Sequence, residues 1–242
     1  EDGFVDIENK KIRILRAHLE EDAGKSIHTL EGDALIDYNR CGAPLLEIVS
    51  EPDMSSADEA MEYLKSLKEI ISSIGASDCN MEKGNLRVDL NISVMPIGSK
   101  TFGNRREVKN VNSFRNVEKA IHHEYNYQCS IIESGGKIEQ ETLLWDDNSE
   151  VTKSIRTKED AHDYRYFPEP DLPPLKISNE LIEEIKNTMP ELPNQIRLDL
   201  YDNYKLNKDQ IDYLVGNREL LNYYRQLCGK NFKNSIKYYN WL

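Results

Sequence analysis

The sequence predicts an α+β fold in which a mostly antiparallel sheet is followed by helices. Apolar and polar residues alternate from Leu86 to Val94, as they do in a half-buried strand. Apolar residues recur with a helical period from Ser56 to Gly75, and again after a proline-rich segment at residues 167–174. The chain has 242 residues, of which 38% are hydrophobic, and is long enough to bury a sizeable core.

In the first half of the chain, strand patterns flank one clear helix. We expect strands at residues 11–21, 45–49 and 86–94, a turn at residues 22–25, and a helix between Ser56 and Gly75. Ser56 and Glu59 have the spacing of a capping box at the start of this helix. Pro52 follows the second strand and ends it, because proline has no amide hydrogen to donate to a sheet.

The second half contains a strand, a helix, a hairpin and then helices alone. The strand covers residues 105–110, with Glu107 and Lys109 on one face, and the helix runs from a Ser113 cap to Gly135. Strands at residues 139–145 and 151–157 form the hairpin, and short helices follow at residues 179–187, 193–204, 207–214 and 219–227. We therefore expect a sheet domain at residues 1–188 and a helical domain at residues 189–242.

Composition excludes several classes of protein. The 43 acidic residues outnumber the 31 Lys and Arg, so the net charge of -12 excludes a general polyanion-binding surface and leaves only a local basic patch for nucleic acid. The four cysteines lie far apart, which argues against a zinc ribbon or a disulfide scaffold and fits a reduced intracellular compartment. No apolar run approaches the roughly 20 residues of a membrane span, so we expect no membrane partner.

Carboxylates on the predicted strands suggest a site for a divalent cation. They are Glu20, Glu21, Asp89, Glu107 and Glu141. Carboxylates that converge on one side of a sheet bind Mg²⁺, which can bridge nucleotide phosphates while nearby Arg and Lys contact the transferred group. The alternative is that these residues belong to ordinary solvated strand faces, and spacing alone favours that alternative.

Three weaker signals favour structural interpretations. His18 is more readily an exposed or half-buried imidazole than a metal ligand. Lys25 follows Asp-Ala-Gly, but the chain has no G-x-x-x-x-G-K-[ST] motif, so we do not predict a phosphate-binding loop. Arg165 lies among three aromatic residues, and aromatics at a domain boundary pack as core more often than they stack on a base.

Six strings of residues, in one order along the chain, closely resemble a known family. They are HLEEDAGK at 18–25, DYNRCGAPLLEIVSEPD at 37–53, MEKGNLRVDLNISV at 81–94, EVKNVNSF at 107–114, QET at 140–142 and DYRYFPEPDLPPL at 163–175. The family is GatB, the B subunit of the aspartyl/glutamyl-tRNA(Asn/Gln) amidotransferases. The resemblance runs from near Asp2 to near Pro193 and more loosely to Leu242.

The resemblance implies an enzyme subunit that uses ATP and Mg²⁺. In this family, GatB phosphorylates the side-chain carboxylate of glutamate mischarged on tRNA-Gln, or of aspartate mischarged on tRNA-Asn, and ammonia then displaces the phosphate. The implied partners are an amidase subunit that releases ammonia from glutamine, a small linker subunit, and the mischarged tRNA, with no DNA. The implied location is the cytoplasm of a bacterium, or a mitochondrion or plastid of a eukaryote.

The family's fold also becomes an expectation for this chain. It is a cradle domain that resembles glutamine synthetase and guanidino kinases, followed by a helical domain and a tail domain that grips the tRNA. The family's first strand, with a Gly-Leu-Glu-hydrophobic-His motif, and its tail domain have no counterpart here. We therefore expect the cradle domain to be incomplete at its N-terminus and the helical domain at its C-terminus.

The matched motifs imply a set of metal ligands. Glu20 and Glu21 belong to the HLEEDAG motif, and Glu107 precedes the family's K-N-x-N-S-F. These three are the implied catalytic Mg²⁺ ligands, bound directly or through water. Glu141, in the QET string, is a further candidate ligand.

Phosphate contacts are expected from two cations. Arg87 and Lys109 lie in the matched strings, share strand faces with acidic residues and are the expected catalytic groups that contact phosphate. Asp89 is a further candidate for cofactor binding. His18 and Arg165 rank below these residues.

Two departures from the family pattern motivate a second hypothesis. Met95 stands where the family usually has arginine before Pro96, and Leu143 where arginine commonly follows QET. Loss of two cations beside a phosphate site would weaken the stabilisation of transition-state charge. The second hypothesis is therefore a non-catalytic scaffold that binds tRNA and the amidase subunit. A free-standing guanidino kinase is disfavoured, because nothing beyond the inferred fold matches that family.

Overall fold

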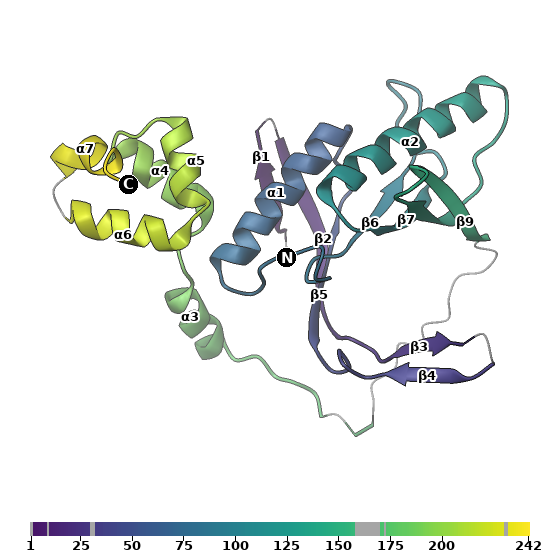
Figure 1. Cartoon of the computed structure of the whole chain (residues 1–242), viewed down its shortest axis with the longest axis horizontal. Coiled ribbons are helices and arrows are strands. Elements are labelled where there is room, and N and C mark those ends of the chain that lie inside the picture. The colour runs from purple at the N-terminus through teal and green to yellow at the C-terminus, as the bar shows by residue number, and fades with distance from the viewer. Residues whose placement is uncertain (1, 9, 30–31, 158–169, 172, 230–231) are drawn as a thin grey trace. The chain divides into compact units, whose positions relative to one another are not determined.

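The computed structural model describes residues 2–8, 10–29, 32–157, 170–171, 173–229 and 232–242 (Figure 1). Contacts within the chain divide it into two compact units, Glu1–Ser66 and Leu67–Leu242, and each unit contains sheet of its own. This division differs from the expected domain boundary between residues 188 and 189, which stays a prediction.

The first unit is built on a three-stranded antiparallel sheet in the order β1-β2-β5. Its strands are β1 (Phe4–Ile7), β2 (Lys10–Glu21) and β5 (Pro44–Ser50). Val5, Ile7 and Ile12 are buried, so the apolar positions of β1 and β2 form the core of this unit. Two further strands, β3 (Lys25–His28) and β4 (Ala34–Asp37), pair as a separate hairpin between β2 and β5 in the chain.

Helix α1 (Ala57–Ser73) begins with half of the predicted capping box. The Ser56 hydroxyl accepts a hydrogen bond from the Glu59 amide at 3.1 Å, as predicted. The Glu59 carboxylate does not return this bond to Ser56; it accepts from the Ser55 amide at 2.6 Å and pairs with Lys10 at 2.6 Å. The helix start is thereby attached to β2 by an ion pair.

The sheet of the second unit has four strands in the order β6-β7-β8-β9. They are β6 (Val88–Ile92), β7 (Arg106–Val111), β8 (Glu141–Asp146) and β9 (Val151–Thr157). The pairs β6–β7 and β8–β9 are antiparallel, whereas β7–β8 is parallel. Parallel neighbours need a long crossover, and α2 (Phe114–Glu133) provides it. Ser113 caps α2 by accepting from the Asn116 amide at 3.1 Å, as predicted.

Helix α2 lies across one face of this sheet (Figure 1). Val108, Leu143 and Trp145 are fully buried, and the Trp145 ring contacts His123 of α2 edge-on with centroids 6.1 Å apart. Val117 and Ala120 of α2 are also fully buried. The apolar positions of β7 and β8 therefore face the helix, and the positions between them face the other way.

Helices make up the described C-terminal part of the chain: α3 (Asn179–Thr188), α4 (Pro193–Asp202), α5 (Lys208–Val215), α6 (Arg218–Cys228) and α7 (Ser235–Tyr239). Helices α4 to α7 share a core in which Leu200, Leu214 and Tyr224 are fully buried. Helix α3 has no buried residue. In the part of the chain that the structure describes, no helix is both long and apolar enough to span a bilayer.

Most of the predicted elements are confirmed, with ends that differ by a few residues. The α+β class is confirmed, and the strand pairs are antiparallel except for β7–β8 among the strands described. The sequence patterns miss β1, β3, β4 and α7, which have only four or five residues each and are too short to show a period. The resemblance to a glutamine synthetase-like cradle stays a prediction.

Candidate functional site

The face of the β6–β9 sheet opposite α2 presents two cross-strand rows of side chains. We call it the open face; it comprises Asp89, Asn91, Glu107, Lys109, Thr142, Leu144, Lys153 and Ile155. The first row joins Asn91, Glu107 and Thr142 by backbone register, and the second joins Lys109, Leu144 and Lys153. Three of the predicted site residues, Asp89, Glu107 and Lys109, belong to the open face.

Lys109 lies between two of the predicted carboxylates. Its Nζ is 3.2 Å from Asp89 Oδ2 and 3.3 Å from Glu107 Oε1. Partial burial lowers the pKa of Lys109, but the charges and hydrogen bonds of Asp89 and Glu107 outweigh burial and raise that pKa above its ordinary value. The side chain is nevertheless 42% exposed, so a positive charge with two acidic neighbours is available to a ligand.

Glu107 is a largely shielded carboxylate on the open face, with 18% of its side chain accessible. Its Oε2 accepts a hydrogen bond from the Thr142 hydroxyl at 3.0 Å, across the parallel β7–β8 pair. One carboxylate oxygen is therefore oriented by Thr142 and the other lies near Lys109. The predicted cluster of Glu107, Lys109 and Asp89 is brought together by the fold.

Glu141 lies on the other face of the same sheet. Its Oε2 accepts from Arg106 Nη2 at 2.8 Å, and Arg106 is buried against α2. Glu141 directly precedes Thr142, and successive side chains of a strand point to opposite faces. The structure therefore does not bring Glu141 together with Glu107, although the sequence predicts both as Mg²⁺ ligands.

Glu20 and Glu21 end β2 in the first unit, opposite Leu45 and Pro44 of β5. Both side chains are exposed, as is that of His18. Because they are consecutive in a strand, they point to opposite faces of the sheet. The next residue, Asp22, pairs with Arg40 at 2.9 Å, so this strand end carries three consecutive acidic residues, of which Asp22 has the Arg40 guanidinium beside it.

Four further positions from the sequence analysis lie outside the open face or outside the described residues. Arg87 is exposed and directly precedes β6. Met95 follows β6 and is 43% exposed. Leu143 is fully buried on the α2 side, so leucine at this position removes no cation from the open face. Arg165 lies outside the described residues.

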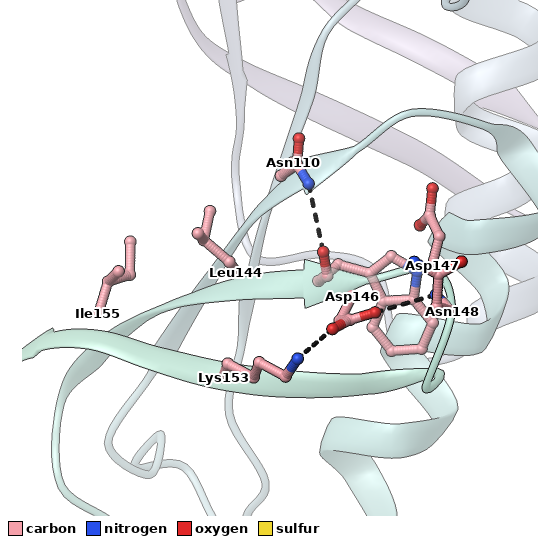
Figure 2. A pocket seen from close by; sticks show the side chains of 8 residues that line it. Asn110, Leu144, Asp146, Asp147, Asn148, Lys153 and Ile155 are labelled. Carbon is pink, nitrogen blue, oxygen red and sulfur yellow. Dashed lines mark hydrogen bonds and ion pairs between the residues drawn. The ribbon is translucent and has the colours of Figure 1, made fainter. Parts of the chain in front are cut away.

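An open hollow adjoins the second row of the open face, around the β8–β9 hairpin (Figure 2). Leu144, Lys153 and Ile155 line it from the strands, and residues 146–148, where β8 passes into the hairpin turn, line its end. Hydrogen bonds from Lys153, and then from the Ser149 and Asn148 amides, lower the pKa of Asp146 to about 2. Asn110 closes the hollow at the end of β7 by donating to the Trp145 carbonyl at 3.2 Å.

The donor chemistry of these residues suits a hard cation. Carboxylate oxygens are the ligands that Mg²⁺ takes in proteins, often with several waters retained. Within the residues that the structure describes, no three His, Cys, Asp or Glu side chains gather closely enough to hold a metal ion. Glu107 fits as one carboxylate ligand of a site that has further ligands from substrate or water.

The sequence patterns miss two residues of this sheet. Thr142 lies in the QET string, but its contact with Glu107 depends on the parallel pairing of β7 with β8. Arg106 is buried, with partners 18 and 35 residues away in the chain. The one available signal is a charged residue at a position of β7 where alternation predicts an apolar one.

Comparison with known proteins places these motifs in one family. A family model described as the GatB/GatE catalytic domain matches residues 1–183. This range includes both β2 and the whole β6–β9 sheet.

Curated relatives extend the similarity over almost the whole chain. The aspartyl/glutamyl-tRNA(Asn/Gln) amidotransferase B subunit of Trichlorobacter lovleyi is 50% identical over 244 residues, which cover 99% of this chain and 51% of the relative. The B subunits of Myxococcus xanthus and Coxiella burnetii are 51% and 53% identical, over 96% and 93% of this chain and 48% of each relative. The chain thus spans about half the length of the relatives. By the match to its first 183 residues and by these identities, the chain belongs to the GatB/GatE catalytic-domain family.

Proposed function

We propose that this chain acts within the B subunit of a tRNA-dependent amidotransferase and activates a carboxylate on a mischarged aminoacyl-tRNA. The substrate is Glu-tRNA-Gln, Asp-tRNA-Asn or both, and the ammonia comes from an amidase subunit. The proposed complex also contains a small third subunit. Membership of the family and the names of the relatives support this assignment.

The observation that carries the proposal is the cluster of Asp89, Glu107 and Lys109 on the open face. It combines a carboxylate for a divalent cation with an ammonium group for phosphate, 3.3 Å apart. This combination suits phosphoryl transfer, because catalysis of that reaction consists mainly of positioning and of neutralising negative charge.

The residues of the chain take separate roles in the proposal. Glu107 is a proposed Mg²⁺ ligand on the open face, and Glu20 and Glu21 of the HLEEDAG motif are further proposed ligands, each bound directly or through water. Lys109 and Arg87 contact the phosphate oxygens, and Asp89 holds Lys109 in place by its ion pair. Bound ATP with Mg²⁺ would supply the phosphoryl group and part of the charge neutralisation.

The proposed reaction consists of two displacement steps, phosphorylation of the carboxylate and then amidation. A carboxylate oxygen of the aminoacyl side chain bonds to the γ-phosphorus while the bond to the β–γ bridging oxygen breaks, which releases ADP. The nitrogen of ammonia then bonds to the acyl carbon, phosphate leaves with the oxygen it gained, and a proton is lost. A carboxylate needs the first step because its oxygen is a poor leaving group until it carries phosphate.

The test uses the complete subunit with its amidase partner, γ-labelled ATP, Mg²⁺ and mischarged Glu-tRNA-Gln. We expect one phosphate released per amide formed, only with the mischarged tRNA. Glu20→Gln and Glu107→Gln are expected to lower the rate roughly a thousandfold, because a lost metal ligand costs several kcal/mol in the transition state.

Glu118→Gln is the matched control, since Glu118 is an exposed carboxylate on α2. It should leave the rate unchanged. Phosphate release that is absent from the wild type, or that survives Glu107→Gln undiminished, would favour the non-catalytic scaffold.

A further inference from the structure

A buried ion-pair network lies on the α2 side of β7, directly behind Glu107 and Lys109. Arg106 Nη1 donates to Glu124 Oε2 at 3.0 Å, and its Nη2 donates to Glu141 Oε2 at 2.8 Å. The side chains of Arg106 and Glu124 are only 6% and 0% exposed. The guanidinium also lies 4.4 Å from the centre of the Tyr127 ring. Buried charges of this kind persist only with well-placed partners.

Glu124 extends the network to the other strands. Its Oε1 accepts from the Thr152 hydroxyl of β9 at 2.6 Å, and its Oε2 accepts from the Gln128 amide at 3.3 Å. Gln128 Nε2 also donates to the Ile92 carbonyl of β6 at 3.1 Å. Together with Arg106 and Glu141, these contacts join α2 to all four strands of the sheet.

The Arg106–Glu141 ion pair is adjacent, along β7 and β8, to the Glu107–Thr142 hydrogen bond that orients Glu107. Backbone pairing of β7 with β8 covers three residue pairs, of which Glu107 with Thr142 is the first. Arg106 precedes Glu107, and Glu141 precedes Thr142. The ion pair on the α2 side and the Glu107–Thr142 hydrogen bond on the open face therefore lie on consecutive residues of both strands.

We propose that Arg106, held between Glu124 and Glu141, is a positioning residue for the carboxylate activation proposed above, on which this inference depends. It sets the register and spacing of β7 against β8, and so places Glu107 and Lys109 for their roles. Glu141 serves this ion pair and is not a Mg²⁺ ligand. A displacement of about 1 Å at a reacting group can cost roughly 100-fold in rate, so a shift of this strand is enough to impair catalysis.

Glu141 provides the sharpest test, because it is the most exposed member of the ion pair, at 21%. In the complete complex, Glu141→Ala should lower tRNA-dependent phosphate release roughly 10- to 100-fold, as loss of a supporting contact does. Glu141→Gln should recover most of the rate, because its amide oxygen still accepts from Arg106. The Mg²⁺ concentration for half-maximal rate should stay unchanged in both variants.

The control is Glu139→Ala, an exposed carboxylate two residues before Glu141. A half-saturating Mg²⁺ concentration that rises by about tenfold or more in Glu141→Gln would make Glu141 a metal ligand and overturn the inference. Rates unchanged in Glu141→Ala would overturn it as well.

Arg106→Lys keeps the test informative if Glu141→Ala does not fold, as judged by circular dichroism. Lysine can reach only one of the two carboxylates well, so the rate should fall while half-saturating Mg²⁺ does not change. An Arg106→Lys rate equal to that of the wild type overturns the inference. Failure of the proposed function is distinguishable, because the wild-type complex would then release no tRNA-dependent phosphate.

Discussion

At the residue scale, Lys109 is the open-face cation that we propose to contact phosphate. Lys109→Met removes this charge and leaves Asp89 and Glu107 without the ammonium group that they share. We expect kcat for phosphate release to fall roughly 10²- to 10³-fold, as it does when a group that stabilises developing charge is lost. Steady-state kinetics of the complete complex measures this loss.

Lys153 is the comparison residue for this prediction. It lies on the same face, on β9, and pairs with Asp146 at the β8–β9 hairpin. Lys153→Met should keep most of the activity. Equal losses in the two variants would show that general electrostatics, and not the position of Lys109, determines the rate.

The pKa of Asp53 is set mainly by its neighbour Arg13. Hydrogen bonds from the Arg13 side chain, with smaller contributions from the Arg13 amide and the charge of Lys10, lower the pKa of Asp53 from 3.8 to about 2, against the opposing effect of burial. Because the folded pKa is depressed, Asp53 contributes stability above pH 3.8, and this contribution is lost as the pH falls through 2.

Removal of the Arg13 side chain should reverse this shift. In Arg13→Ala, the titration midpoint of Asp53 should rise toward 3.8, as followed by carbon NMR of the side-chain carboxyl groups. Asp146, whose low pKa depends on Lys153, should keep its midpoint in the same spectra. An unchanged titration midpoint of Asp53 in Arg13→Ala would mean that Arg13 does not cause the low pKa of Asp53.

At the element scale, one buried carboxylate, Glu124, adds an ion pair to the apolar packing of α2 on the sheet. Glu124→Ala leaves Arg106 buried with Glu141 as its remaining ion-pair partner. We expect the free energy of unfolding to fall by about 3–5 kcal/mol, the cost of breaking a buried pair, in urea denaturation. Glu118→Ala, on the exposed side of α2, should change it by less than about 0.5 kcal/mol. Similar losses would mean that helix propensity and not the ion pair is responsible.

The start of α2 gives a smaller, local effect. Ser113→Ala removes the acceptor for the Asn116 amide, and should lower the free energy of unfolding by about 1 kcal/mol. Ser113→Asp keeps an acceptor and should retain most of the stability. Thermal unfolding of the two variants checks the difference. A loss of stability as large in Ser113→Asp as in Ser113→Ala would contradict the capping role of Ser113.

At the scale of the whole molecule, the net charge of -12 opposes binding of the isolated chain to nucleic acid. Affinity for nucleic acid comes largely from Lys and Arg on phosphates, and this chain has an excess of carboxylates. We expect the isolated chain to bind tRNA with a Kd weaker than about 10⁻⁴ M at physiological salt, the weak end of non-specific binding. Filter binding measures it, with a full-length GatB for comparison. Micromolar binding by the isolated chain would require a basic surface that the net charge conceals.

Neighbouring residues in the sequence are enough to predict most of the helices and strands, and to predict which candidate residues share a strand face. The alternation around Asp89, the alternation that pairs Glu107 with Lys109 on one face, and the Ser113 cap are all encoded in neighbouring residues, and the structure confirms each of them. The strings of the GatB family are also legible without coordinates, and the family match bears them out. Local periodicity suffices here because a strand or helix places its side chains by spacing alone.

The partners of these residues, and the side of the sheet on which each one lies, depend on contacts between distant parts of the chain. The parallel pairing of β7 with β8 places Glu107 beside Thr142 and turns Glu141 toward Arg106, on the opposite side of the sheet. Packing of α2 on the sheet buries Arg106 against Glu124, and Leu143 is buried on the same side of the sheet. Strand order and register arise from contacts between residues distant in the chain, and a shift of one residue exchanges the two faces of a strand. No local pattern carries that information.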